Sequence, residues 1–258
     1  MSIHLIRVVT FNANGIRSAL RKGFWSVMEQ LDADVICVQE TKAHCLQLEL
    51  PVHQNYQAYY SDAEKKGYSG VAIYSRLSKP TSVDTQSRLE IANQEGRFIA
   101  LRWPNFNVAN WYLPSGTSGI ERQAIKYQHL HFLEYDFLPK QEGGTVVCGD
   151  FNIAHIRDDL ARWKENQRSS GFLPDERAFL DRMAKQWVDT FRVKQQGTGF
   201  YTWWTFRAGA RERNVGWRLD HQWVTPDLKP KILQVGILKE PVLSDHAPYW
   251  VDYDISVA

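Results

Sequence analysis

The chain has 258 residues, 43% of them hydrophobic, which suits one large globular core, and we expect a single domain spanning 1–258. A net charge of only +2 excludes a uniformly basic protein, so any nucleic-acid partner would need a local basic patch. No apolar stretch approaches the length of a membrane span, and the first residues lack the pattern of a secretory leader.

These features predict a cytoplasmic protein, associated with the nucleoid if bacterial. Three cysteines, Cys37, Cys45 and Cys148, fit buried free thiols in a reducing compartment. Nothing in the sequence indicates an oligomer, so we expect a monomer.

In the first half of the chain, apolar periodicity predicts the following elements in order: a strand at 5–11, a helix at about 18–31, strands at 35–39 and 70–75, and a hairpin of 97–103 with 107–112.

The second half gives two helices and a strand-rich end: a helix at 120–142, a strand at 145–150, a helix at 174–187 and strands at 201–206, 217–225, 232–238 and 247–255. Many of these strands alternate apolar and polar residues, which is typical of antiparallel sheets with one covered face. The pattern favours an α/β fold in which two sheets pack together with helices outside.

Polar side chains follow one predicted strand after another, where each strand ends or just before the next begins: Asn12, Asn14, Glu40, Tyr112, Asp150, Asn152, Asp220, Asp245 and His246. In the run VVCGDFN, side chains two apart point the same way in an extended chain, so Asp150 and Asn152 would face one point.

Each position also has a purely structural interpretation. Residues 12–15 would make an ordinary turn, Glu40 a solvated carboxylate, Asp150 the cap of a helix near Ile153, 244–246 a turn, and Tyr112 part of the core. If all of these interpretations held, several unrelated turns would by chance carry the residue types of a single active site. The joint occurrence of these polar residues therefore favours a functional site.

The residue types indicate phosphate chemistry. Oxygen ligands such as Glu40, Asp245 and Asn12 select Mg²⁺ or Mn²⁺ over Zn²⁺. A His–Asp pair would stabilise or protonate a phosphate, Asp150 would position a water, and Asn152 and Tyr112 are neutral donors for a phosphate oxygen. This inventory fits hydrolysis of a phosphodiester.

The motifs TFNANGIR, VICVQETK, GYSGVAIYSR, GDFNIAH, GFLPDER, NVGWRLD and SDHAP occur in the order found in the exonuclease III family, which comprises the apurinic/apyrimidinic (AP) endonucleases of base-excision repair. The resemblance runs from about Leu5 to Tyr253. GDFN and SDH are shared by the larger endonuclease/exonuclease/phosphatase superfamily, whereas GFLPDER and NVGWRLD indicate the DNA-repair branch.

The resemblance implies an α/β fold of four α-β-β-α layers, a DNase I-like sandwich of two mixed, largely antiparallel sheets. It implies Glu40 as the main metal carboxylate, with Asn12 and Asp245 in support. The roles that it implies around the phosphate are water activation by Asp150, with Asn152 beside it, phosphate contact by Tyr112, and a site histidine, His246, oriented by Asp220.

It further implies phosphate binding by Asn166 and an apolar wall for the flipped-out abasic sugar at Trp203, Trp217 and Leu219. Without the resemblance, Trp217 fits ordinary core. Basic residues on loops near the site would hold DNA, although each alone fits a solvated surface charge: Arg17, Arg21, Lys22, Lys65, Lys66, Arg207, Arg211, Arg213 and Arg218.

The sequence departs from the family pattern at three places. Ser115 stands where many relatives carry an asparagine or glutamine, and Ser169 where some relatives carry a second asparagine. These two positions leave open the ratio of AP endonuclease to 3′-exonuclease activity. Asn14 is an aspartate in some relatives.

We therefore expect a phosphodiester hydrolase, a metal-dependent repair nuclease. It would act on double-stranded DNA, cleaving 5′ to abasic sites to leave a 3′-hydroxyl, and would trim damaged 3′ ends. The alternatives are mainly a 3′–5′ exonuclease, a phospholipid-directed phosphodiesterase of the same superfamily, or a DNA-binding protein without activity.

Overall fold

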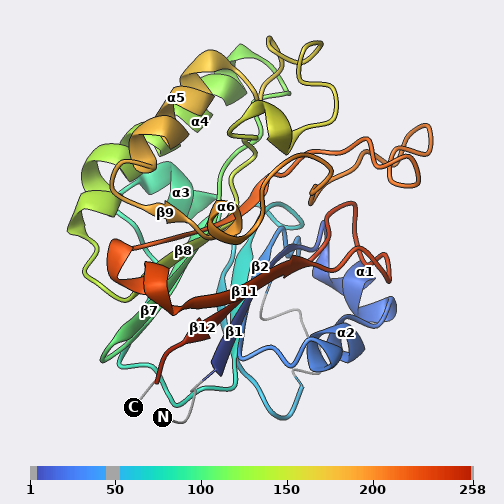
Figure 1. Cartoon of the computed structure of the whole chain (residues 1–258). Coiled ribbons are helices and arrows are strands. Elements are labelled where there is room, and N and C mark those ends of the chain that lie inside the picture. Colours follow the sequence, from blue (N-terminus) through green and yellow to red (C-terminus); the bar gives the residue numbers. More distant parts are fainter. Residues whose placement is uncertain (1–4, 45–52, 257–258) are drawn as a thin grey trace.

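The computed structural model describes residues 5–44 and 53–256, and Cys45 lies outside them. Two six-stranded sheets form its centre (Figure 1). In spatial order, the first sheet contains β11 (Ile232–Ile237), β12 (Tyr249–Asp254), β1 (Leu5–Asn12), β2 (Val35–Gln39), β4 (Val71–Ser75) and β3 (Gln57–Ser61). The second contains β5 (Ser82–Asp84), β6 (Phe98–Trp103), β7 (Phe106–Tyr112), β8 (Thr145–Asp150), β10 (Asp220–Val224) and β9 (Val188–Asp189).

Among the strands that the structure describes, only the central pair of each sheet is parallel. Strand β1 runs parallel to β2, and β7 runs parallel to β8, whereas the other strand pairs in both sheets are antiparallel. Each sheet is thus mixed but largely antiparallel, as predicted. The parallel pairs matter because they bring two carboxyl ends of strands to the same edge of each sheet.

Helices cover the outer face of each sheet (Figure 1). On the first sheet lie α1 (Ile16–Arg21) and α2 (Phe24–Gln30), whose buried residues pack with Val9, Phe11 and Ile36. On the second lie α3 (Glu90–Gln94), α4 (Ile120–Phe132) and α5 (Pro174–Met183). A short α6 (Thr190–Lys194) follows β9. The predicted four-layered sandwich is confirmed.

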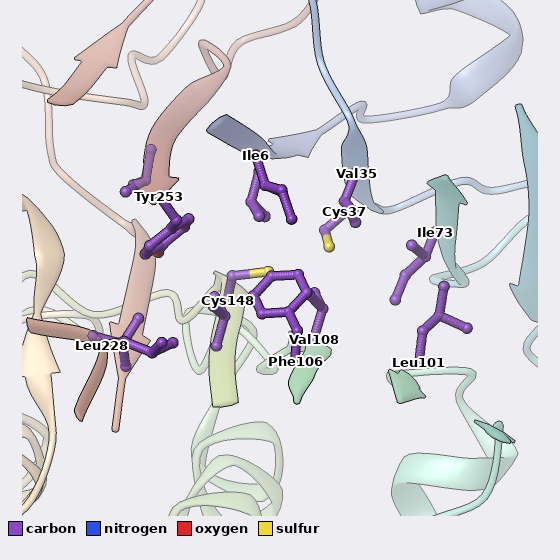
Figure 2. Packing of buried hydrophobic residues seen from close by; sticks show 14 of the residues in the cluster. Ile6, Val35, Cys37, Ile73, Leu101, Phe106, Val108, Cys148, Leu228 and Tyr253 are labelled. Atoms are coloured by element: carbon purple, nitrogen blue, oxygen red, sulfur yellow. The ribbon is translucent and has the colours of Figure 1, made fainter. Parts of the chain in front are cut away.

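The central layer is filled by residues from both sheets. Along β1, Ile6 and Val8 point into this layer while Val9 and Phe11 point to the helices, which is the alternation expected for a strand covered on both faces. Figure 2 shows Cys37 of the first sheet and Cys148 of the second near each other among Val35, Val108 and other apolar side chains. Both thiols are buried and free, as predicted.

Several element boundaries differ from the sequence prediction. The helix expected at 18–31 is interrupted by Gly23, whose φ of 91° ends α1 and starts α2. The helix expected at 120–142 continues past Phe132 through a π-helical segment (Leu133–Phe137) and a 3₁₀ turn (Leu138–Lys140). The helix expected at 174–187 ends at Met183.

The strand predicted at 201–206 is wrong. Trp203 forms only isolated bridges, to Trp217 and to His246, so the segment does not join a sheet as a regular strand. The strand predicted at 217–225 covers only Asp220–Val224, and Trp217 before it forms isolated bridges to Leu160 and Trp203. Among the described residues, no helix is long and apolar enough to cross a membrane.

The buried His129 on α4 generates a prediction about stability. Burial lowers its pKa to about 4, below its ordinary value of 6.5. Between these values the unfolded chain binds a proton that the folded chain excludes, so the contribution of neutral His129 to stability is complete above about pH 6.5 and is lost as the pH falls toward 4.

Relative to a His129→Leu variant, the natural chain should lose about 1 kcal/mol of unfolding free energy per pH unit over this window. Urea unfolding at several pH values measures the difference. Parallel stability curves for the two proteins would show that His129 does not titrate in this way.

Candidate active site

The polar residues predicted at strand ends converge on one end of the sandwich. Asn12 ends β1 and Glu40 directly follows β2, its parallel neighbour. Tyr112 and Asp150 end the parallel strands β7 and β8 and lie opposite each other in the register. Asp220 begins β10 opposite Asp150. The two sheets therefore deliver their polar ends to a common place.

Asn12 joins the two sheets at this end. Its buried amide nitrogen donates to Glu40 Oε1 at 2.9 Å and to Asp150 Oδ2 at 2.8 Å. Its oxygen accepts a hydrogen bond from the backbone nitrogen of Asn14 at 2.9 Å. A single amide thus fixes two carboxylates that belong to different sheets.

Glu40 has a cationic partner. Lys42 Nζ lies 2.7 Å from Glu40 Oε2 and also bonds the side chain of Asn14. Burial alone would raise the Glu40 pKa, but Lys42 and the hydrogen bonds from Asn12 and Tyr112 outweigh it and lower the pKa. The carboxylate is therefore held charged, in surroundings that already accept a cation.

Asp150, His246 and Asp220 form a buried chain of titratable groups. His246 Nδ1 lies 2.8 Å from Asp220 Oδ2, and its Nε2 lies 3.8 Å from Asp150 Oδ2. Burial lowers the His246 pKa, but the carboxylates Asp220 and Asp150 outweigh it and raise the pKa to about 10. Burial raises the Asp150 pKa to about 7, against the lowering effect of His246.

Asn152 is fixed beside Asp150. Its backbone nitrogen donates to Asp150 Oδ1 at 2.8 Å, and its side-chain amide donates to the Leu113 carbonyl at 2.9 Å. No helix begins at Ile153, so Asp150 is not a helix cap. Asn14, Glu40 and Asn152 all have φ between 44° and 52°, the left-handed region in which strained residues gather at functional sites.

Asp245 lies on the last loop of the site. Its Oδ1 accepts from the Asn14 side chain at 3.0 Å, and its Oδ2 accepts from Trp203 Nε1 at 3.1 Å. Within the described residues, no three His, Cys, Asp or Glu side chains form a ready metal cluster. The oxygen donors present, Glu40 first and Asp245 second, match a hard cation that keeps several of its own waters.

These residues surround a cavity of about 370 Å³. Trp203 and Trp217 form one wall with their rings edge to face, 6.5 Å apart between centroids. The cavity therefore has a polar floor and an apolar side, and it is lined by Glu40, Tyr112, Ser115, Thr117, Asp150, Asn152, Ser169, Ser170, Gly171, Trp203, Trp217, Leu219, Asp245 and His246.

Asn166 is not among the residues lining the cavity. Its amide donates to the Arg162 carbonyl at 2.8 Å, and its oxygen accepts from the Ser169 hydroxyl at 3.1 Å. Ser169 lines the cavity in its place. A phosphate role for Asn166 stays a prediction, now one that requires its local bonds to open.

The predicted DNA-holding cations divide into exposed and buried groups. Exposed side chains are found at Arg17, Arg21, Lys22, Lys65, Lys66, Arg207 and Arg213. Arg218 is wrong as a DNA ligand, because it is buried and paired with Asp159 and Asp189. Arg211 is half-buried and donates to the carbonyls of Ser244 and Lys239, so a DNA role for it stays a prediction.

Sequence reasoning missed three cations near the site. Lys42 follows Glu40 by two residues, and that spacing was a usable signal. Arg97 donates to the Tyr112 carbonyl at 3.0 Å and lies over the Tyr112 ring. Lys126 donates to the Asn152 carbonyl at 2.8 Å. The last two come from positions distant in sequence, where no local pattern marks them.

Comparison with known proteins identifies the family of the chain. The model of the endonuclease/exonuclease/phosphatase family matches residues 9–246. The chain belongs to this family. It is 38% identical to an exodeoxyribonuclease of Bacillus subtilis over 94% of this chain and 97% of that protein.

A DNA-(apurinic or apyrimidinic site) endonuclease of Dictyostelium discoideum is 32% identical over 97% of this chain and 71% of that protein. Among solved structures, an AP endonuclease from Archaeoglobus fulgidus superposes with a TM-score of 0.87 at 28% identity, covering 97% of this chain and all of that one. The resemblance to the exonuclease III branch is confirmed.

The Lys42–Glu40 contact generates a prediction about cation binding. A divalent ion at Glu40 would meet the Lys42 ammonium as a like charge. Lys42→Met should therefore tighten Mn²⁺ binding severalfold, a gain of about 1 kcal/mol for one removed repulsion near the surface. Isothermal titration calorimetry with Mn²⁺ measures it.

Lys65→Met, which removes an exposed cation resting over Tyr68, is the matched control. Unchanged or weaker Mn²⁺ binding in Lys42→Met would mean that Lys42 does not compete with a cation for Glu40.

Proposed function

We propose that this protein is a DNA-repair nuclease that uses Mg²⁺ or Mn²⁺. It hydrolyses the phosphodiester 5′ to an abasic site in double-stranded DNA, leaves a 3′-hydroxyl, and also trims 3′ ends. The observation that carries the proposal is the Asn12 amide, which holds Glu40 and Asp150 together on the floor of a cavity with a tryptophan wall.

In the proposed reaction Asp150 accepts the proton of the attacking water. A carboxylate with a pKa near 7 suits a general base at neutral pH, because it is a stronger base than a solvated aspartate yet still substantially ionised. Asn152 is bonded to Asp150 and lines the same cavity, so it would orient the phosphate beside the water.

The phosphate would also meet positive charge and a neutral donor. His246 stays protonated at neutral pH because Asp220 and Asp150 raise its pKa. Its cation would stabilise charge on a phosphate oxygen, and the Tyr112 hydroxyl would donate to another. Asp220 acts through His246, which it orients and keeps charged.

Glu40 and Asp245 would hold the divalent ion, with Asn12 orienting Glu40. When bound, such an ion neutralises charge on the phosphoryl group. Exposed Arg17, Arg21, Lys22, Lys65 and Arg213, with Asn166 if its local bonds open, would contact DNA phosphates, which positions a duplex without reading its sequence.

The tryptophan wall supports preference for an abasic site. Trp203, Trp217 and Leu219 offer an apolar surface to a deoxyribose that has been rotated out of the helix. Rotation costs least where no base pair exists, so the cavity would select abasic sugars. We further propose that residues 1–258 act as one domain, as a monomer in the cytoplasm.

A second candidate is an enzyme that mainly trims 3′ ends. Ser115 and Ser169 line the cavity with short side chains where relatives carry amides, so contacts to the sugar-phosphate would be fewer. Fewer such contacts would lower incision within a duplex more than removal of a frayed 3′ nucleotide.

Two labelled duplexes test the proposal. One carries a single abasic-site analogue, and the other is undamaged with a recessed 3′ end. We expect cleavage 5′ to the analogue that depends on Mg²⁺ and is blocked by EDTA. Shortening of the recessed end alone would favour the second candidate, and no cleavage of either duplex in Mg²⁺ or Mn²⁺ would overturn the proposed function.

Asp150→Asn separates chemistry from binding. The variant keeps the shape of Asp150 but cannot accept the proton of water, so kcat for incision should fall by at least about 10²-fold while duplex affinity changes little. Single-turnover cleavage and fluorescence anisotropy measure the two. Asp175→Asn, at an exposed position on α5, is the control. Full-rate cleavage by a folded Asp150→Asn protein would exclude Asp150 as the base.

A further inference from the structure

A buried ion pair lies behind the cavity, and the proposed chemistry does not use it. Lys126 of α4 and Glu176 of α5 both have side chains with 0% exposure, and Nζ lies 2.6 Å from Oε1. Neither residue lines the cavity. Moving two charges out of water costs free energy that their attraction and their other hydrogen bonds must offset. Those other hydrogen bonds show which segments the pair holds in place.

Glu176 holds one wall of the cavity. Its Oε2 accepts from the backbone nitrogens of Gly171 at 2.7 Å and Leu173 at 3.0 Å, and its Oε1 accepts from the Ser170 hydroxyl at 3.3 Å. Ser170 and Gly171 line the cavity. Glu176, the second acidic residue of the GFLPDER motif, therefore fastens the segment before α5 to the start of that helix.

Lys126 holds the adjoining segment, where water activation is proposed. Its Nζ donates to the Asn152 carbonyl at 2.8 Å, and Asn152 in turn donates its backbone nitrogen to Asp150. The ion pair thus connects the proposed base, Asp150, to the cavity wall at Gly171 through three residues: Asn152, Lys126 and Glu176.

The wall and the base-side segment also touch directly. Gly171 has a φ of +95°, and a Cβ there would lie 3.0 Å from the Asn152 carbonyl oxygen and 3.3 Å from the Trp217 ring. The cavity wall therefore has little room to move toward Asn152. Moving away would stretch the hydrogen bonds to the buried carboxylate.

We infer that Lys126 and Glu176 are a positioning pair that fixes the width of the sugar cavity relative to Asp150 and Asn152. This inference rests on the proposed function and deepens it. A fixed wall accepts a deoxyribose without a base, whereas a wall that yields would also admit the bulkier nucleotide at an intact 3′ end. The pair therefore sets the ratio of abasic-site incision to 3′ trimming.

The test replaces both charges at once. A single substitution would leave an unpaired buried charge, so Lys126→Met is combined with Glu176→Gln. For abasic incision, kcat/KM should fall about tenfold, as for a small misplacement of a reacting group. Trimming of a recessed 3′ end should change much less, so that the ratio of the two activities shifts several-fold.

The chain offers a matched control. Arg182 of α5 pairs with Glu134 in the π-helical segment that continues α4, so it joins the same helical layers away from the cavity. The Arg182→Gln and Glu134→Gln double variant should leave the ratio unchanged. A milder variant, Gln123→Ala, removes bonds to Glu176 and Ser170 and should shift the ratio in the same direction if the first double variant fails to fold.

Amide hydrogen exchange of residues 169–173 gives a readout that does not require activity. It should accelerate in the Lys126→Met/Glu176→Gln protein and not in the control. Equal loss of both activities, with an unchanged ratio, or unchanged exchange in a folded variant, would overturn the inference. Absence of incision and trimming in the natural protein would instead overturn the proposed function, and the exchange result would still test whether Lys126 and Glu176 hold the wall in place.

Discussion

The site depends on one buried amide. The side-chain nitrogen of Asn12 donates to Glu40 and Asp150, which come from different sheets, and its oxygen accepts from the backbone nitrogen of Asn14. Two carboxylates held this close repel each other and lose solvation. Lys42 beside Glu40 and His246 near Asp150 supply the compensating charge, one on each side of the amide.

This arrangement explains how much the sequence could predict. Polar residues at strand ends are visible as local patterns, so the sequence predicted that Glu40, Asp150, Asn152 and His246 share one site. The strand pairing that brings them together, β1 parallel to β2 and β7 parallel to β8, was not visible. Alternation of apolar residues suggested antiparallel sheets and carries no information about which strands become neighbours.

The run NVGWRLD shows where a composition argument failed. Its arginine suggested DNA binding because it lies among tryptophans. In an extended segment neighbouring side chains point to opposite sides, so Trp217 and Leu219 face the cavity and Arg218 faces the interior. There Asp159 and Asp189 bind it. Arg218 therefore anchors the apolar wall of the cavity from behind, and its neighbours Trp217 and Leu219 form part of that wall.

The backbone around Glu40 shows how the sheets hold a strained position. The left-handed backbone conformation of Glu40, with a φ of 51°, costs about 1–3 kcal/mol of conformational free energy. Such a conformation persists only where the surrounding structure fixes it. The Glu40 carbonyl accepts from Gly15 at 2.8 Å, and the next nitrogen, of Thr41, donates to Gly70 at 3.1 Å. A Cβ on Gly70 would lie 2.3 Å from Thr41 Oγ1. Gly70, the second glycine of the GYSG motif, is therefore needed so that the turn after β2 can approach β4. That approach keeps Glu40 within reach of Asn12, so the separate motifs VICVQETK and GYSGVAIYSR meet in a single geometric requirement.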